Sequence, residues 1–407
     1  MKISLQNGLF GSKNKDVILS NAILIFILFG CVFVYFTGIL PYRIPASVDY
    51  SFRYIIPALF CIRAITKLNS KNLVRLLIFE LFFGLSYLFT FITGNVNRDQ
   101  ITLYLVMTII FCVPFGVFLT QIDDLKVFYS GLVKISFIIF GIVTVYLLVR
   151  IRNTTTIWGD ASYSMPAGYQ LLLCLCVFTN ESFKKEYRGK RILYLICAFV
   201  SFVMIFLYGS RGPIACYAGF LIYKVLIEFR HNKYIRTISV ICGILLIASE
   251  LFSTNIANAL VSALQRIGVA SRTVSAIISN QIFQDSGRVT IISNAIEIIK
   301  SNPIIGSGAS SDLILLGGYP HNLFVELCID FGVIIGLLLS LIIVIKVFRS
   351  LVICGDENKN LTGVFFACGF CMLMLSSTYL QNIYFFMFLG LMARDENSKF
   401  IRFKVSR

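Results

Sequence analysis

The chain has 407 residues, of which 57% are apolar and only 14% are charged, and its mean hydropathy is +0.84. Polar residues this scarce could not cover so much apolar surface in water, so the composition excludes an ordinary soluble domain and predicts an integral membrane protein. Membrane topology and attraction to anionic lipid explain the net charge of +16, which therefore gives no reason to expect nucleic acid as a partner.

Twelve apolar runs predict an all-α polytopic membrane protein, one integral membrane domain over residues 1–407. About 20 helical residues at 1.5 Å each match a hydrocarbon core of about 30 Å, and the runs lack the alternation of a membrane β-barrel. The second and twelfth are short, so re-entrant segments are the alternative there. The predicted spans are 17–36, 54–65, 73–92, 102–120, 128–149, 161–178, 192–207, 213–227, 235–252, 323–347, 361–378 and 382–392.

The basic residues indicate how the chain is oriented. No cleavage pattern follows the first apolar run, so it should stay as an anchor with the N-terminus in the cytoplasm. The C-terminus then lies there too, and only ten of the 36 Lys and Arg residues fall in outer segments, as the positive-inside rule requires. Nine of these ten are arginines, which bind phosphate or carboxylate through two parallel N–H donors; the alternative is that arginine tolerates membrane interfaces well. The ten are Arg43, Arg53, Arg98, Arg150, Arg152, Arg211, Arg266, Arg272, Arg288 and Lys300.

The twelve cysteines do not form a pattern typical of disulfides or metal sites. Nearly all fall within apolar spans, and the long outer loop has none. Cys368 and Cys371 form a Cys-x-x-Cys pair, but no second pair or histidine accompanies it, so both are interpreted as packing residues. No outer cluster of His, Cys, Asp or Glu suggests a metal, and we expect neither a metal nor any other cofactor.

Residues 253–320 form the one long break in the apolar pattern, and the span count places this loop outside, in the periplasm or exterior. A loop of this length usually has a function. Two amphipathic helices are expected in it: 255–282, which carries Arg266 and Arg272, and 287–300. Arg288 falls in the first turn of the second helix, where a cation opposes the helix dipole. An anion held by Arg288 and the free amides would offset that cost, and a tolerated exposed arginine is the alternative.

A second arginine lies in a tight outer turn between two predicted spans. Arg211 follows Ser210, and Gly209 and Gly212 on either side let the backbone approach a ligand closely. A charge at the edge of the hydrocarbon is costly unless it faces a polar cavity. We therefore predict that Arg211 contacts substrate.

The stretch Gly317 to Leu327, GGYPHNLFVEL, contains one of only two histidines, at the boundary between the outer loop and the tenth span. The other histidine, His231, lies in a predicted inner basic loop. An imidazole with an ordinary pKa near 6.5 suits a general base at neutral pH. A helix N-cap or an interfacial residue is the alternative for His321.

Four motifs, taken in order, resemble the O-antigen ligase and polymerase superfamily of bacterial envelope glycan assembly. They cover roughly residues 195–347. In ligases of this family, a histidine followed by Asn, Ser or Gln is typically followed nine residues on by a glycine, and after two more residues by Gly, Thr or Tyr. Here Gly332 matches the glycine, whereas Ile335 occupies the position of the Gly, Thr or Tyr. The motifs are Gly209-Ser210-Arg211-Gly212, Ser286-Gly287-Arg288, Asn302-Pro303-Ile304-Ile305-Gly306-Ser307-Gly308, and His321-Asn322 leading into Phe331-Gly332-Val333-Ile334-Ile335-Gly336.

The resemblance implies a metal-independent, inverting glycosyl transfer from an undecaprenyl-diphosphate-linked glycan at the outer face of the bacterial inner membrane. Arg211 and Arg288 would clamp the diphosphate, and His321 would accept the proton of the acceptor hydroxyl or orient it. The residues expected to assist in binding are Arg150, Arg266, Arg272, Ser210, Tyr319 and Asn322.

Three alternatives accompany the preferred activity, which is polymerisation of O-antigen or capsular repeat units, with a chain-length regulator as a partner protein. A ligase would use the same donor and transfer the glycan to lipid A core or another acceptor. A flippase for the glycan lipid would need a polar path, for which Glu80 and Asp330 are candidates, but the two similar halves of many transporters are not seen. A polytopic sensor or scaffold would not need arginines from separate loops to converge.

Overall fold

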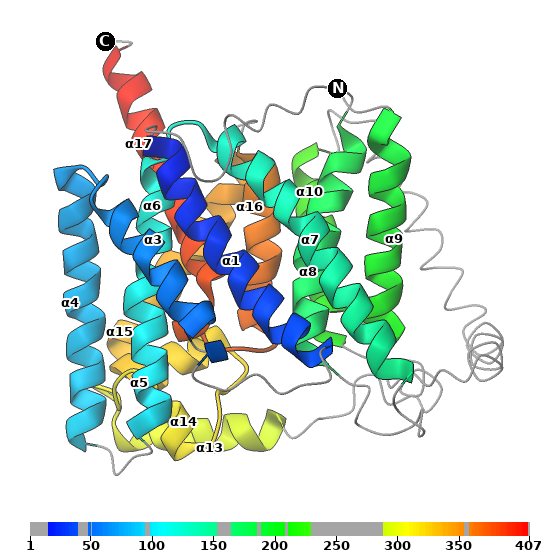
Figure 1. Cartoon of the computed structure of the whole chain (residues 1–407). Helices are drawn as coiled ribbons and strands as arrows, with labels where there is room; N and C mark the ends of the chain where they lie inside the picture. The colour runs from blue at the N-terminus through cyan, green and yellow to red at the C-terminus, as the bar shows by residue number, and fades with distance from the viewer. Residues whose placement is uncertain are drawn as a thin grey trace. The chain divides into compact units, whose positions relative to one another are not determined.

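The computed structural model describes residues 15–39, 48–49, 51–93, 98–152, 164–184, 189–207, 211–228, 288–353 and 358–405 (Figure 1). These residues form helices and turns without a β-strand, which confirms the predicted all-α class. In the first part of the chain the helices are α1 (Lys15–Ile39), the π-helix η2 (Ser51–Ile55), α3 (Ile56–Ile65), α4 (Ser70–Thr93), α5 (Arg98–Val106), the π-helix η3 (Met107–Cys112), α6 (Val113–Gln121), α7 (Leu125–Arg152), α8 (Met165–Phe183), α9 (Arg191–Leu207) and α10 (Arg211–Glu228). The later ones are α13 (Arg288–Ser301), α14 (Ser311–Leu315), α15 (Leu323–Ile353), α16 (Lys359–Phe365), the π-helix η6 (Phe366–Cys371), the 3₁₀ turn η7 (Tyr379–Gln381) and α17 (Ile383–Val405).

Five helical segments among the described residues are long and apolar enough to cross a membrane. They coincide with the first, third, fourth, fifth and tenth predicted spans. The other described spans correspond to shorter or less apolar helices, so the structure supports a membrane protein with five candidate spans, while the count of twelve stays a prediction. The five segments are Lys15–Tyr35, Ser70–Thr93, Asp99–Gln121, Leu125–Val149 and Leu323–Ser350.

One predicted span differs from the structure, and two other predicted elements lie outside the described residues. The predicted span 361–378 is helical only as far as Leu373, and irregular turns follow it. The predicted span 235–252 and the loop helix 255–282 lie outside the described residues. The loop helix expected at 287–300 is present as α13.

Large apolar side chains are exposed along several of these helices, which is the pattern expected when lipid is the solvent. The α4 segment illustrates it: only 22% of its apolar window is buried, and Leu81 is 64% exposed. Exposed residues on α4, α9 and α15 include Leu77, Ile78, Leu85, Ile92, Ile192, Phe199, Leu337, Leu341 and Phe348.

The chain divides into two compact units. Unit 1 comprises Met1–Ile27, Tyr50–Gly131 and Asp285–Arg407, and unit 2 comprises Leu28–Asp49 and Leu132–Gln284. In unit 1, α17 packs along α6, and the glycines Gly116 and Gly390 let their backbones meet, because a Cβ on Gly390 would lie 2.2 Å from the carbonyl oxygen of Gly116. In unit 2, α8 packs against α9 and α10, which also contact each other.

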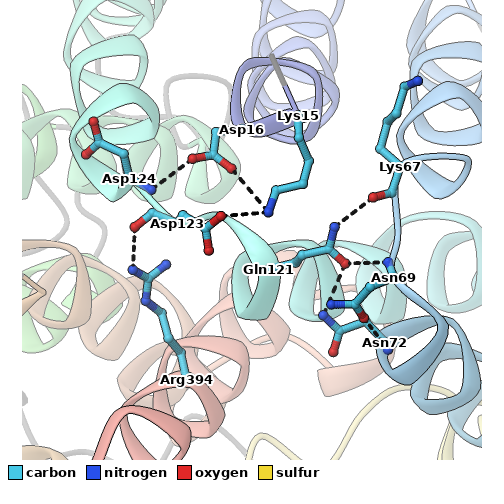
Figure 2. Close-up of polar contacts among 9 residues, drawn as sticks. All are labelled: Lys15, Asp16, Lys67, Asn69, Asn72, Gln121, Asp123, Asp124 and Arg394. Atoms are coloured by element: carbon cyan, nitrogen blue, oxygen red, sulfur yellow. Dashed lines mark hydrogen bonds and ion pairs between the residues drawn. The ribbon is translucent and has the colours of Figure 1, made fainter. Parts of the chain in front are cut away.

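A polar network ties the helix ends of unit 1 together (Figure 2). Lys15 Nζ of α1 lies 2.7 Å from Asp123 Oδ2, and Arg394 of α17 donates to the Asp123 carbonyl at 2.6 Å. The side chain of Gln121 donates to the Lys67 carbonyl at 2.7 Å and accepts from the Asn69 backbone N–H at 2.8 Å. These bonds fix α1, α4, α6 and α17 at the end of unit 1 that the predicted topology assigns to the cytoplasm.

Candidate functional site

The helix α13 brings Arg288 to the start of α15 within unit 1. Arg288 is the first residue of α13, and α13 packs against α15. Its guanidinium Nη2 donates to the carbonyl of Leu375 at 3.1 Å, which orients an otherwise exposed side chain. The positive charge of Arg288 acts on His321, immediately before α15. Two of the predicted catalytic residues therefore lie close enough to interact.

His321 is held in an unusual local conformation. Its φ is +57°, in the left-handed region that few non-glycine residues adopt. The ring is half buried and packs edge-on against Tyr319, with ring centroids 4.6 Å apart. Among the described residues, its buried Nδ1 has no hydrogen-bond partner. An imidazole with a strained backbone and an unpaired ring nitrogen is a candidate for hydrogen bonding to a substrate.

The protonation of His321 follows from its surroundings. Burial lowers its pKa, and the nearby positive charge of Arg288 lowers it further. Both effects disfavour the imidazolium ion, so the ring is neutral at pH 7. A neutral imidazole can accept a proton.

Asn322 has a structural role that is visible in the helix start. Its side-chain Oδ1 accepts hydrogen bonds from the backbone N–H groups of Phe324 at 3.0 Å and Val325 at 3.3 Å. This is the N-cap arrangement, which satisfies donors that the first turn of α15 cannot pair internally. The N-cap role considered for His321 therefore belongs to Asn322, and substrate contact by Asn322 stays a prediction.

The matching glycine of the histidine motif, Gly332, lies at a kink in α15. Its φ is +76° and its ψ is 170°, and a Cβ there would lie 2.3 Å from the Ile304 carbonyl oxygen. The kink interrupts helix hydrogen bonds, and residues 303–308 replace them: Val333 N–H donates to the Pro303 carbonyl at 2.7 Å, and the Ile329 carbonyl accepts from Ser307 N–H at 2.8 Å. We call residues 303–308 the latch. The latch is part of the motif Asn302 to Gly308, and its hydrogen bonds join that motif to the helix that contains Gly332.

Three buried carboxyl groups lie on α14 and α15, and sequence reasoning did not group them. Asp312 of α14 and both Glu326 and Asp330 of α15 are each 1% exposed and interact electrostatically. Burial raises the pKa of Asp312 to about 7. The Thr378 hydroxyl donates to Glu326 Oε1, and the Tyr379 hydroxyl donates to Asp330 Oδ2 at 2.7 Å.

Only Asp330 had been singled out, as part of a possible polar path. The signal for the others was present, because Glu326 lies in an apolar run without a neighbouring base and Asp312 occurs in a mostly apolar loop segment. The groups of His, Cys, Asp and Glu in the described part of the chain do not form a set of three suited to a metal ion.

The remaining predicted site residues lie in unit 2 or outside the described residues. Arg211 begins α10 and is partly exposed, and Arg150 lies near the end of α7, both in unit 2. Ser210, Arg266 and Arg272 lie outside the described residues. The structure thus brings together Arg288, Tyr319, His321 and Asn322, whereas the convergence of Arg211 with them stays a prediction. 

The comparison with known families agrees with the motifs. Residues 196–341 match the family model Wzy_C, described as O-antigen ligase. The match includes Arg211, Arg288, His321 and Gly332, and it confirms the resemblance to the O-antigen ligase and polymerase superfamily. No curated protein and no solved structure was found to match the chain.

Proposed function

We propose that this membrane protein, whose residues 196–341 match the O-antigen ligase family model, is a glycosyltransferase that extends or transfers a glycan carried on undecaprenyl diphosphate. The observation that supports it most is the pairing of Arg288 with a neutral, half-buried His321 inside the matched segment. One group suits an anionic leaving group, and the other suits the proton of an attacking hydroxyl.

In the proposed reaction the hydroxyl of the acceptor sugar attacks the anomeric carbon of the donor. His321 accepts the hydroxyl proton as the new C–O bond forms. The bond between the anomeric carbon and the diphosphate oxygen breaks at the same centre, and its electron pair leaves with the diphosphate. Attack from the face opposite the leaving group inverts the anomeric configuration.

Arg288 is suited to the charge that develops on the leaving group. Its guanidinium fork is oriented by the Leu375 carbonyl, so little reorganisation is needed when a phosphate binds. Arg211 is proposed as the second cation of the clamp, with Arg150, Arg266 and Arg272 assisting. These arginines would supply the charge that a divalent ion supplies elsewhere.

Within this reaction class we favour polymerisation, with a second lipid-linked repeat unit as the acceptor and a chain-length regulator as a partner. Ile335 stands where ligases of the family typically have Gly, Thr or Tyr. The ligase reaction is the second candidate, because the matching family model is described by that activity. In both cases we place the protein in the bacterial inner membrane, with the site facing outward.

The test is the glycan profile of a deletion strain and of strains complemented with variants. Single repeats attached to the surface would identify a polymerase, and long chains stranded on the carrier lipid would identify a ligase. His321→Asn retains a residue that tolerates the left-handed backbone, so it isolates the loss of the imidazole.

Both His321→Asn and Arg211→Ala should give the deletion profile at normal membrane abundance. Lys300→Ala, at the far end of α13 from Arg288, is the matched control and should leave chain lengths unchanged. Wild-type chain lengths in the Arg211→Ala strain would contradict the proposed clamp.

A further inference from the structure

A small pocket in unit 1 lies between the last turn of α4 and the chain that connects α13 to α14. Its volume is about 210 Å³, below the roughly 300–1,000 Å³ of pockets for drug-sized ligands. Phe89 and Thr93 contribute one wall, and Asn302, Ser307, Ser311 and Leu315 contribute to the other. Figure 1 shows α14 at the end of unit 1 where α4 ends and α5 begins.

The walls of this pocket are preformed. The Thr90 hydroxyl donates to the Ala309 carbonyl at 2.8 Å, and the Ala309 N–H donates to the Ser86 hydroxyl at 2.9 Å, so the connecting chain is fastened to α4. Gly308, at φ +88°, allows this approach, because a Cβ there would lie 2.9 Å from the Ser86 carbonyl oxygen. The latch fixes the other side, since Ser307 N–H bonds to the Ile329 carbonyl.

The chemistry of the lining favours a neutral polar ligand. No Lys, Arg, His, Asp or Glu is among the described residues that line the pocket, so an anionic ligand would find no opposite charge there. The polar groups are hydroxyls and one amide. The Ser307 hydroxyl is buried, and the described residues offer it no hydrogen-bond partner. A buried hydroxyl of this kind is normally satisfied by a bound group or by water.

The apolar residues of the lining also suit a carbohydrate ligand. Phe89 is 36% exposed and Leu315 is 51% exposed, so both offer apolar surface beside the hydroxyls. A sugar ring has hydroxyls at its edge and C–H groups on its faces, and this combination suits both kinds of surface. A lipid acyl chain would fill the volume but would leave Ser307 unpaired in a dry site.

We propose that this pocket binds one neutral sugar ring of the glycan, away from the ring that reacts. The chain that lines it continues through α14 to Tyr319 and His321. Only a short segment therefore separates a sugar bound here from His321 along the chain. The neutral polar class of ligand follows from the lining, whereas the assignment to the glycan substrate rests on the proposed function. The pocket thereby acts as a specificity subsite.

The experiment is saturation-transfer NMR on the purified full-length protein in nanodiscs. The probes are the methyl glycosides of glucose, galactose, N-acetylglucosamine and rhamnose. At least one should receive saturation from the wild-type protein. Ser307→Ala should weaken its binding about three- to tenfold, the effect of losing one hydrogen bond, and Thr93→Trp should abolish it by filling the pocket.

Two variants serve as matched controls. Ile92→Trp places the same side chain on the adjacent, 74% exposed position of α4, and Ser293→Ala removes a hydroxyl from the exposed face of α13. Both should bind the glycoside as the wild type does, with circular dichroism confirming equal helicity in every variant. The proposal is overturned if no glycoside receives saturation, or if Thr93→Trp retains the wild-type signal.

This outcome is separate from that of the proposed function. His321→Asn should lose glycan assembly and keep glycoside binding. If the His321→Asn strain keeps the wild-type glycan while the glycoside still binds, the glycosyl-transfer proposal is wrong and the sugar pocket is supported. If glycoside binding is absent while the His321→Asn strain loses its glycan, only the sugar pocket is wrong.

Discussion

The Gly332→Ala variant tests the kink in α15 that the latch contacts. Its backbone conformation is one that essentially only glycine adopts, and imposing it on alanine costs about 1–3 kcal/mol. The new Cβ would also lie 2.3 Å from the Ile304 carbonyl oxygen, so the latch must move away. Loss of one latch hydrogen bond adds about 0.5–1.5 kcal/mol, which brings the expected destabilisation to about 1.5–4.5 kcal/mol.

The measurement is the unfolding midpoint in detergent, titrated with sodium dodecyl sulfate and followed by circular dichroism. Gly84→Ala on α4 is the matched control, because a Cβ there meets nothing within 4 Å. Alanine in a helix interior is favoured over glycine by about 0.5–1 kcal/mol, so this variant should be as stable as the wild type or more stable. An unfolding midpoint for Gly332→Ala equal to that of Gly84→Ala would refute the strain argument.

Three further predictions concern the site. The transfer rate, measured against pH with purified protein in nanodiscs, should be flat through neutrality and fall only below the ordinary histidine pKa of 6.5, because the pKa of His321, the proposed neutral base, is lowered. A rate that fell already between pH 8 and 7 would contradict this. Arg288→Gln removes a positive charge and should raise the pKa of His321, moving the acidic fall of the residual rate to higher pH. Arg288→Lys keeps the charge and should leave the fall near its wild-type position; equal shifts in both variants would exclude a charge effect. Glu326→Leu leaves the Thr378 hydroxyl without its acceptor and should destabilise the protein by about 1–3 kcal/mol in the same unfolding titration, whereas Glu326→Gln, which keeps an acceptor oxygen, should cost less. Equal losses in these two variants would show that the hydrogen bond is not the cause.

The sequence predicted the elements that depend on local patterns. Long apolar runs identified α1, α4 and α7, because the length and composition of a membrane helix are local properties. The cap formed by Asn322 was also readable, since an asparagine directly before an apolar helical run is a common start signal, although the residue was assigned only to substrate binding.

The features that the sequence did not show depend on contacts between distant segments. The sequence shows Glu326 in an apolar helix but gives no sign that Asp312 and Thr378 lie beside it. Gly332 matched a family pattern, but its reason for being glycine is the carbonyl of Ile304, which no periodicity indicates. Hydropathy indicates where apolar segments lie and how long they are, but it does not indicate which backbone groups from distant segments contact each other.

The latch also has a consequence for how the chain enters the membrane. The kink in α15 leaves backbone groups at Ile329 and Val333 without helical partners, and such groups are costly in hydrocarbon. Their partners in residues 303–308 precede α15, so a ribosome delivers them before the helix that needs them. The side-chain partners of Glu326 and Asp330, by contrast, are Thr378 and Tyr379, which are synthesised later. We therefore expect α15 to be inserted with its backbone already paired, and its two acids to acquire these partners only when the end of the chain arrives.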